Sequence, residues 1–328
     1  MILATSTNAL FERADGSRIP VEESIRRCAE AGYRALDFCF LDQITTKTAF
    51  LGPHWRDYLK EIRDLAESLD VRFIQSHGPL YDFCNTSDPQ QEELVRRSAE
   101  GSRLLGAPWM VMHPMSKVRG DRLDPETPER NAAFFRELSD YAGKFGVGVA
   151  VENMWGKTRE GVRRYAVDPE EFFDLLDRID AENTGACWDV EHGSIEGLDQ
   201  GAAIRALGGR LKALHISDQT SHANIHILPY LGVTDWDEIL TALADIGYDH
   251  PFTYEIQHYL LRLPLELVPS ALRLSWEIGD YLVRRLEQSP QVLREARRKA
   301  LEEAASRLKG LVDREIGGTG RVRGWQAQ

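Results

Sequence analysis

The chain has 328 residues, of which 42% are hydrophobic and 28% charged, and its formal net charge is −12. Nucleic-acid binding needs a basic face that displaces counterions from phosphates, so this balance disfavours a nucleic-acid partner and favours small-molecule chemistry. No run approaches the ~20 apolar residues of a membrane helix, and the first residues lack the pattern of a signal peptide. The four cysteines form no CxxC pair, so we expect reduced thiols in a cytoplasmic protein.

Short apolar runs alternate with amphipathic stretches along most of the chain. The runs are rich in Val, Ile and aromatic residues, and few polar positions interrupt them, which is typical of parallel strands covered on both faces. The strands that we expect are Ile2–Ser6, Ala35–Phe40, Arg72–His77, Trp109–His113, Gly148–Asn153, Thr184–Val190, Leu211–Ser217 and Phe252–Ile256.

Helical patterns lie between these runs. The predicted helices include Val21–Ala31, Tyr58–Leu69, Glu92–Leu105, Glu129–Phe145, Pro169–Ile179, Trp236–Ile246 and Leu265–Leu286. A glycine that can take the left-handed conformation closes four of them, at Gly32, Gly106, Gly146 and Gly247. The strand starts recur at roughly 35-residue intervals, and eight strand–helix units predict a closed (β/α)₈ TIM barrel, an α/β fold, as one domain over residues 1–287.

The chain continues beyond the last helix of the predicted barrel as an extension over residues 288–328. Pro290–Val312 is a highly charged helical pattern with leucines and alanines along one side, and Gly317–Gln328 is rich in Gly and Arg, so we expect this tail to be disordered. The helix can pack on the barrel, join two copies as a homo-oligomer, or stand in solvent. The pattern leaves these three alternatives open.

Charged and imidazole side chains gather at one rim of the predicted barrel. Active sites of (β/α)₈ barrels lie at the C-terminal ends of the strands, and six consecutive strands deliver a His, Glu or Asp there. Each alone has a structural explanation, since a strand-end histidine is often simply hydrogen-bonded, and Asp189 or Asp218 can cap the next helix. Several like charges on one rim repel one another, however, and a bound cation explains their convergence.

The last four strands provide the metal ligands that we expect, one from each strand. These ligands are Glu152, Asp189, His215 and Glu255. Three carboxylates and one imidazole favour a moderately hard divalent ion, with Mn²⁺ first and Mg²⁺, Co²⁺ or Zn²⁺ as alternatives. Zinc usually prefers a site richer in nitrogen or sulfur. Further histidines can supply more ligands or bind substrate hydroxyls, namely His77, His113, His192 and His226.

The order and spacing of several motifs resemble the xylose isomerase-like TIM barrel superfamily, in the sugar phosphate isomerase and epimerase branch that is related to the zinc AP endonucleases. The resemblance runs from the first strand to about Tyr259. The motifs are His77-Gly-Pro-Leu-Tyr, His113-Pro, Val151-Glu152-Asn153, Asp189-x-x-His192, His215-x-x-Asp218 and His226…Gly232-x-x-Asp235-Trp236, followed by Glu255.

This resemblance implies a metal-dependent isomerase or epimerase that acts on a sugar or sugar derivative. In the epimerase members the matches of the four predicted ligands hold the metal, and the matches of Glu152 and Glu255 are the acid–base pair on opposite faces of a ketose. A metal stabilises the enediolate that forms when a C–H proton leaves, and carboxylates remove and return that proton. The expected substrate contacts are His77, His113, His192, His226 and Trp155, the last as an apolar wall.

Two alternative activities follow from the same resemblance. Keto-sugar dehydratases and lyases share the first proton abstraction. The zinc AP endonucleases use a trinuclear site that includes an aspartate two residues before the match of His226, where this chain has Asn224, a weaker and neutral donor.

The loops beyond the strands carry several basic residues, which can bind a substrate phosphate or carboxylate or be solvated charge. They are Lys117, Arg119, Arg122, Lys157, Arg159, Arg163 and Arg164.

Overall fold

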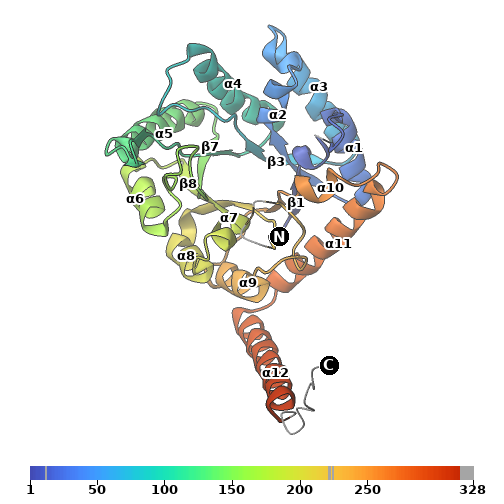
Figure 1. Ribbon diagram of the computed structural model, residues 1–328. Helices are drawn as coiled ribbons and strands as arrows, with labels where there is room; N and C mark the ends of the chain where they lie inside the picture. Colours follow the sequence, from blue (N-terminus) through green and yellow to red (C-terminus); the bar gives the residue numbers. More distant parts are fainter. Residues whose placement is uncertain (12, 221–222, 224, 318–328) are drawn as a thin grey trace, which may run out of the picture.

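A barrel of eight parallel strands forms the centre of the molecule, with helices around it (Figure 1). The computed structural model describes residues 1–11, 13–220, 223 and 225–317, with the backbone alone for 310 and 312–317. The barrel strands are β1 (Leu3–Ser6), β2 (Ala35–Cys39), β3 (Arg72–His77), β4 (Trp109–Met112), β7 (Gly148–Glu152), β8 (Thr184–Asp189), β9 (Leu211–His215) and β10 (Phe252–Tyr254).

The strands neighbour one another in chain order, from β1 through β9, with β10 beside β1. Ile216, just past β9, bridges Tyr254 of β10 in parallel, and its N–H donates to Thr253 O at 2.8 Å. This bridge brings the first and last strands of the order together. The predicted α/β barrel is confirmed.

Eight longer helices surround the strands in Figure 1. They are α1 (Val21–Ala31), α3 (Trp55–Ser68), α4 (Pro89–Leu105), α5 (Thr127–Gly143), α6 (Pro169–Ile179), α8 (Gln200–Leu207), α9 (Trp236–Asp245) and α11 (Val268–Leu286). Each turns an apolar stripe inward, and α6, for example, buries Phe172, Leu175, Leu176 and Ile179. Seven of the eight were predicted, with ends within three residues; α8 was not named.

Several short elements were not predicted; most lie in the connections after strand ends, and one lies directly before β9. They are η1 (Thr7–Leu10), α2 (Phe40–Thr45), η2 (Ala49–Leu51), the β5–β6 hairpin (Val118–Arg119 and Arg122–Leu123), α7 (Val190–Ile195), η3 (Gly208–Arg210) and α10 (Gln257–Leu260). Predicted strands that ran to Phe40 and Val190 therefore end one residue earlier, because both residues begin a helical turn. Gly32 and Gly106 cap α1 and α4 at φ 117° and 89°, as expected.

The extension forms one long helix, α12 (Pro290–Gly317), that leaves the barrel beside α9 (Figure 1). Its first turns pack on the barrel, because Leu293 is fully buried and Arg297 pairs with Asp235 at 3.0 Å and with Glu238 at 2.6 Å. Leu301 and Leu308, further along, are more than half exposed. Packing on the barrel thus holds for the start of α12 alone. Gly317, the first residue of the predicted disordered tail Gly317–Gln328, ends α12, and the rest of that tail lies outside the described part of the chain.

The four cysteines are buried free thiols. Over the described ranges, no helix combines the length and the apolar character that crossing a membrane requires.

Candidate metal centre

The ends of the last four barrel strands bring the predicted ligands together. Glu152, Asp189 and His215 are the final residues of β7, β8 and β9, and Glu255 follows β10 directly. One ligand atom from each of the four lies within 4.8 Å of the others. The first three are buried, and the Glu255 side chain is 14% exposed. The spacing and the donor types suit one divalent cation.

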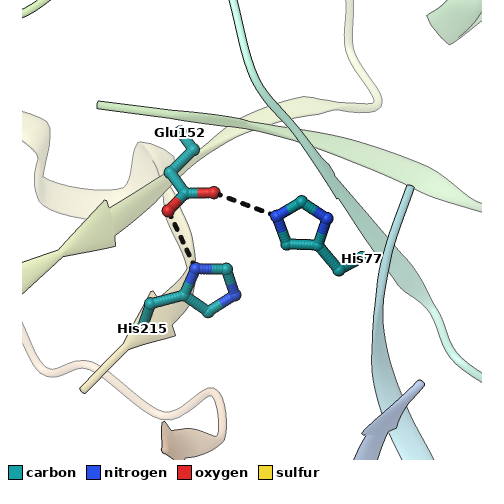
Figure 2. Close-up of side chains that lie close together, drawn as sticks. All are labelled: His77, Glu152 and His215. Atoms are coloured by element: carbon teal, nitrogen blue, oxygen red, sulfur yellow. Dashed lines mark hydrogen bonds and ion pairs between the residues drawn. The ribbon is translucent and has the colours of Figure 1, made fainter. Parts of the chain in front are cut away.

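Glu152 lies at the centre of the cluster, between histidines from other strands (Figure 2). Its Oε1 is 2.9 Å from His215 Nδ1, and its Oε2 is 3.4 Å from His77 Nε2 and 2.9 Å from His113 Nε2. Burial alone would raise the pKa of Glu152, but the charges of His215 and His113 outweigh it and hold that pKa well below its ordinary value. Glu152 is therefore a carboxylate at neutral pH.

Asp189 has both a structural contact and an unused oxygen. Its Oδ1 accepts from His192 N–H at 3.0 Å at the start of α7. The Asn153 side-chain amide donates to the Asp189 carbonyl at 3.1 Å and accepts from the Asp189 N–H at 2.6 Å. Its buried Oδ2 has no hydrogen-bond partner among the residues that the structure describes. Burial, and then the charges of Glu152 and Glu255, raise the pKa of Asp189 well above its ordinary value. A buried oxygen without a partner is costly, and a cation bound by the four ligands would supply one.

Asp37 on β2 supports the cluster from below and was missed by the sequence analysis. Its Oδ2 accepts from Gln75 Nε2 at 2.9 Å and lies 3.6 Å from His215 Nε2. His215 Nδ1 faces Glu152 and Glu255 instead. A carboxylate behind a ligating imidazole fixes its tautomer and orientation. The signal in the sequence was a single acid inside an apolar strand.

The five predicted substrate contacts surround one cavity of about 520 Å³ above the cluster. They are His77, His113, Trp155, His192 and His226, and Glu152 and Glu255 also line it. His77 and His113 approach each other to 3.3 Å between their Nε2 atoms.

His192 and Trp155 form a stacked pair in this cavity. Their ring centroids are 3.9 Å apart and their planes differ by 18°. His192 Nδ1 lies 2.8 Å from Asn153 O, and Nε2 is 3.4 Å from Asp189 Oδ2. Burial lowers the pKa of His192 to about 3, so this imidazole is neutral. Its position is set by backbone and aromatic contacts.

Glu191 holds His226 in place, and the sequence analysis gave it no role. Its Oε2 accepts from His226 N–H at 2.9 Å and from Ser217 Oγ at 2.7 Å, and its Oε1 accepts from Ile225 N–H at 2.6 Å. Glu191 is fully buried. One carboxylate thus fixes the loop that carries His226. Asn224, whose weak donor character disfavours a third metal, lies outside the described residues.

The Asp218 and Gly232 motif is structural. Asp218 Oδ1 accepts from the Gln219 and Thr234 amides at 2.9 and 3.1 Å, and its Oδ2 accepts from Trp236 Nε1 at 3.0 Å. A Cβ on Gly232 would lie 2.3 Å from Asp218 Oδ1, so no larger residue fits without a shift. These hydrogen bonds of Asp218 fix the loop before α9.

Comparisons with known proteins agree with this architecture. A family model described as xylose isomerase-like TIM barrel matches residues 25–276. Inosose isomerase of Bacillus velezensis is 24% identical over 249 residues, which are 72% of this chain and 83% of that protein. L-ribulose 3-epimerase of a Methylomonas species is 25% identical over 264 residues, or 76% of this chain and 82% of that protein. The structure of a D-tagatose 3-epimerase-like protein has the same fold, with a TM-score of 0.66 at 20% identity, and the match covers 87% of this chain and 98% of that one.

Proposed function

Because the chain belongs to the xylose isomerase-like TIM barrel family, we propose that it is a metal-dependent isomerase or epimerase of a sugar or sugar derivative. The observation that carries this proposal is the convergence of three carboxylates and one imidazole within 4.8 Å at the base of a cavity of about 520 Å³. A cavity of this size suits a small-molecule substrate.

Glu152, Asp189, His215 and Glu255 would hold the divalent ion, and Mn²⁺ is our first choice for this oxygen-rich donor set. The buried Oδ2 of Asp189, which has no hydrogen-bond donor within the described ranges, supports this assignment. When bound, such an ion polarises a substrate carbonyl or hydroxyl and stabilises the negative charge that develops there.

Glu152 and Glu255 are the residues that we assign to proton transfer. Burial would raise the pKa of Glu255, but His215 and His226 lower it to about 2, and the pKa of Glu152 is also depressed. Both groups are therefore ionised at neutral pH, and an ionised carboxylate is the form that accepts a proton. If one carboxylate removes a proton from a carbon and the other returns a proton to its opposite face, the configuration of that carbon is inverted, which is epimerisation. A proton delivered to the neighbouring carbon instead gives isomerisation.

The ring of imidazoles would orient the sugar over these carboxylates. His77, His113, His192 and His226 line the cavity, and Trp155 adds an apolar surface. The neutral imidazole of His192 can both donate and accept, which suits a hydroxyl group. The donors and acceptors of the cavity therefore match a polyol substrate.

Solvent deuterium exchange tests this function. The protein is incubated with Mn²⁺ in D₂O and a panel of ketoses that includes L-ribulose and inosose, and deuterium is followed by NMR. We expect incorporation next to the carbonyl of at least one member, and its loss when EDTA removes the metal. Loss of water from the sugar would instead indicate a dehydratase. Absence of exchange across the panel, or nicking of duplex DNA at an abasic site, would contradict the proposal.

A further inference from the structure

A second cavity of about 860 Å³ opens beside the site cavity. The two share Leu80, His113 and Trp155 as lining residues, so they adjoin at the edge of the metal centre. The second cavity extends over the β5–β6 hairpin and the loop between β7 and α6, where Arg159 and Arg164 line it. An unsubstituted sugar held over the metal ligands leaves this space unused.

Three of the seven basic residues of these loops are already paired with carboxylates. Lys117 lies 3.4 Å from Glu126, Arg119 pairs with Asp124 at 2.9 Å, and Arg163 pairs with Glu171 at 2.6 Å. These three are solvated or structural charges, as one of the two predicted alternatives had it.

Arg164 differs from its neighbour Arg163. Its guanidinium lies 5.0 Å from the centroid of the Trp155 ring, and its Nε donates to the Lys157 carbonyl at 3.3 Å. No carboxylate lies within ion-pair distance of it in the described part of the chain, and the residue is half-buried. Burial lowers the pKa of Arg164, yet the group stays charged. A half-buried guanidinium without a carboxylate partner is therefore available to bind an oxyanion of a ligand.

The loop that carries Arg164 is tied in place without any ligand. The Arg164 N–H donates to Gly156 O at 3.0 Å, the Thr158 N–H donates to Val162 O at 2.7 Å, and the Gly156 N–H donates to Glu196 Oε1 at 2.7 Å. The guanidinium is thus preorganised at the cavity. Two acids also line this cavity: Asp82 is occupied by the Asn85 amide at 2.9 Å, and Glu160 is exposed and screened by solvent.

We propose that the second cavity binds an anionic substituent of the substrate, a carboxylate or a phosphate, through Arg164. This inference rests on the proposed function and narrows it from any sugar to an acidic sugar derivative. The reacting carbons lie over Glu152 and Glu255, and the substituent reaches past Trp155. A guanidinium presents two parallel N–H donors, which match the two oxygens of either anion.

Calorimetric titration of the Mn²⁺-loaded full chain tests the inference with four ketoses that differ at C6: D-fructose, D-fructuronate, D-fructose 6-phosphate and isomaltulose. They carry a hydroxyl, a carboxylate, a phosphate and a neutral sugar. We expect one or both anions to bind at least about tenfold tighter than D-fructose, the size of a charge-assisted hydrogen bond. Turnover near the carbonyl leaves C6 intact and does not disturb the comparison.

Arg164→Gln should abolish the anion preference, whereas the matched control Arg163→Gln, whose charge is already paired with Glu171, should retain it. The relative affinities of the two anions distinguish carboxylate from phosphate. No anion preference, an unchanged preference in Arg164→Gln, or tighter binding of isomaltulose than of both anions would overturn the inference. Exchange of a neutral ketose without anion preference leaves the proposed function standing and removes the inference. Arg164-dependent anion binding without proton exchange would support the inference and contradict the proposed function.

Discussion

The base and the wall of the site cavity are held by different parts of the chain. The base consists of Glu152, which lines the cavity, with Asp189 and His215 clustered against it, and these are the last residues of three neighbouring strands. Backbone pairing sets their relative positions, since Asp189 lies opposite His215 in the register of β8 and β9. The wall consists of Trp155, His192 and His226, which lie in loops and in the short helix α7.

Side-chain contacts, rather than strand pairing, position the wall. Glu191 holds the His226 amide, and the Asn153 carbonyl faces the His192 ring. Strand pairing in a barrel is shared by all eight strands, whereas each wall residue depends on one or two local contacts. We therefore expect changes to the base to affect chemistry and metal binding, and changes to the wall to affect substrate binding.

The largest effect should come from the base itself. Glu152→Gln removes the carboxylate that we assign to proton transfer, so deuterium exchange should fall by about 10³-fold or more. The circular dichroism spectrum should stay unchanged, because glutamine has the same shape. The exposed Glu182→Gln serves as control. Exchange at the wild-type rate would remove Glu152 from the acid–base role.

A smaller effect should follow from the support beneath the base. Asp37→Asn keeps the size of the side chain but weakens its hold on His215 Nε2, so the affinity for Mn²⁺ should fall by about 10- to 100-fold. Isothermal titration calorimetry measures this change. Asp70→Asn, at an exposed carboxylate, should leave the affinity unchanged. Equal affinities in the two variants would show that Asp37 does not position His215.

The wall should respond differently. Glu191→Leu leaves the buried amide of His226 without an acceptor, at a cost of about 1–3 kcal/mol, and also frees the half-buried amide of Ile225, so the loop should shift. We expect KM to rise while Mn²⁺ affinity stays the same. Glu191→Gln keeps one carbonyl oxygen and should restore part of the substrate affinity. A loss of metal affinity equal to the rise in KM would erase the distinction between wall and base.

The smallest effect on turnover is expected far from both. Leu293→Ala leaves a gap between α12 and the barrel, with a cost of up to about 2–5 kcal/mol in the docking of this helix. Leu308→Ala, at an exposed position, should change it by less than about 0.5 kcal/mol. Amide hydrogen exchange of α12 reports the difference, and the deuterium-exchange activity should be equal in both. Reduced activity in Leu293→Ala would mean that α12 communicates with the site.

Much of the base was predictable because barrel geometry converts chain order into spatial order. A polar residue at the end of each apolar run has one place to go, the C-terminal rim, so the residues that gather there could be named from strand ends, and the family resemblance selected the four candidate ligands among them. Asp37 could not be named in this way. It lies inside an apolar strand, and the sequence does not say which face of that strand points at His215.

The basic loop residues show the same division. Arg163 and Arg164 are adjacent and identical in type, and no sequence pattern separates them. In the folded chain Arg163 pairs with Glu171, whereas Arg164 lies over Trp155 and has no carboxylate partner among the residues that the structure describes. Their different surroundings depend on how the loop after β7 turns, which is a property of its backbone hydrogen bonds.

By itself the sequence determined the barrel, most of its helices, and the residue types that gather at its rim, because apolar periodicity and strand-end position are local properties. The tertiary structure decided which contacts those residues make. It placed Asp37 near His215 Nε2 and placed Glu191 against the amide of His226. Among the residues that the structure describes, it left Asp189 Oδ2 without a hydrogen-bond donor and the Arg164 guanidinium without a carboxylate. Such contacts join residues far apart in the chain, or distinguish neighbours by direction alone, and only the packed backbone sets distance and direction together.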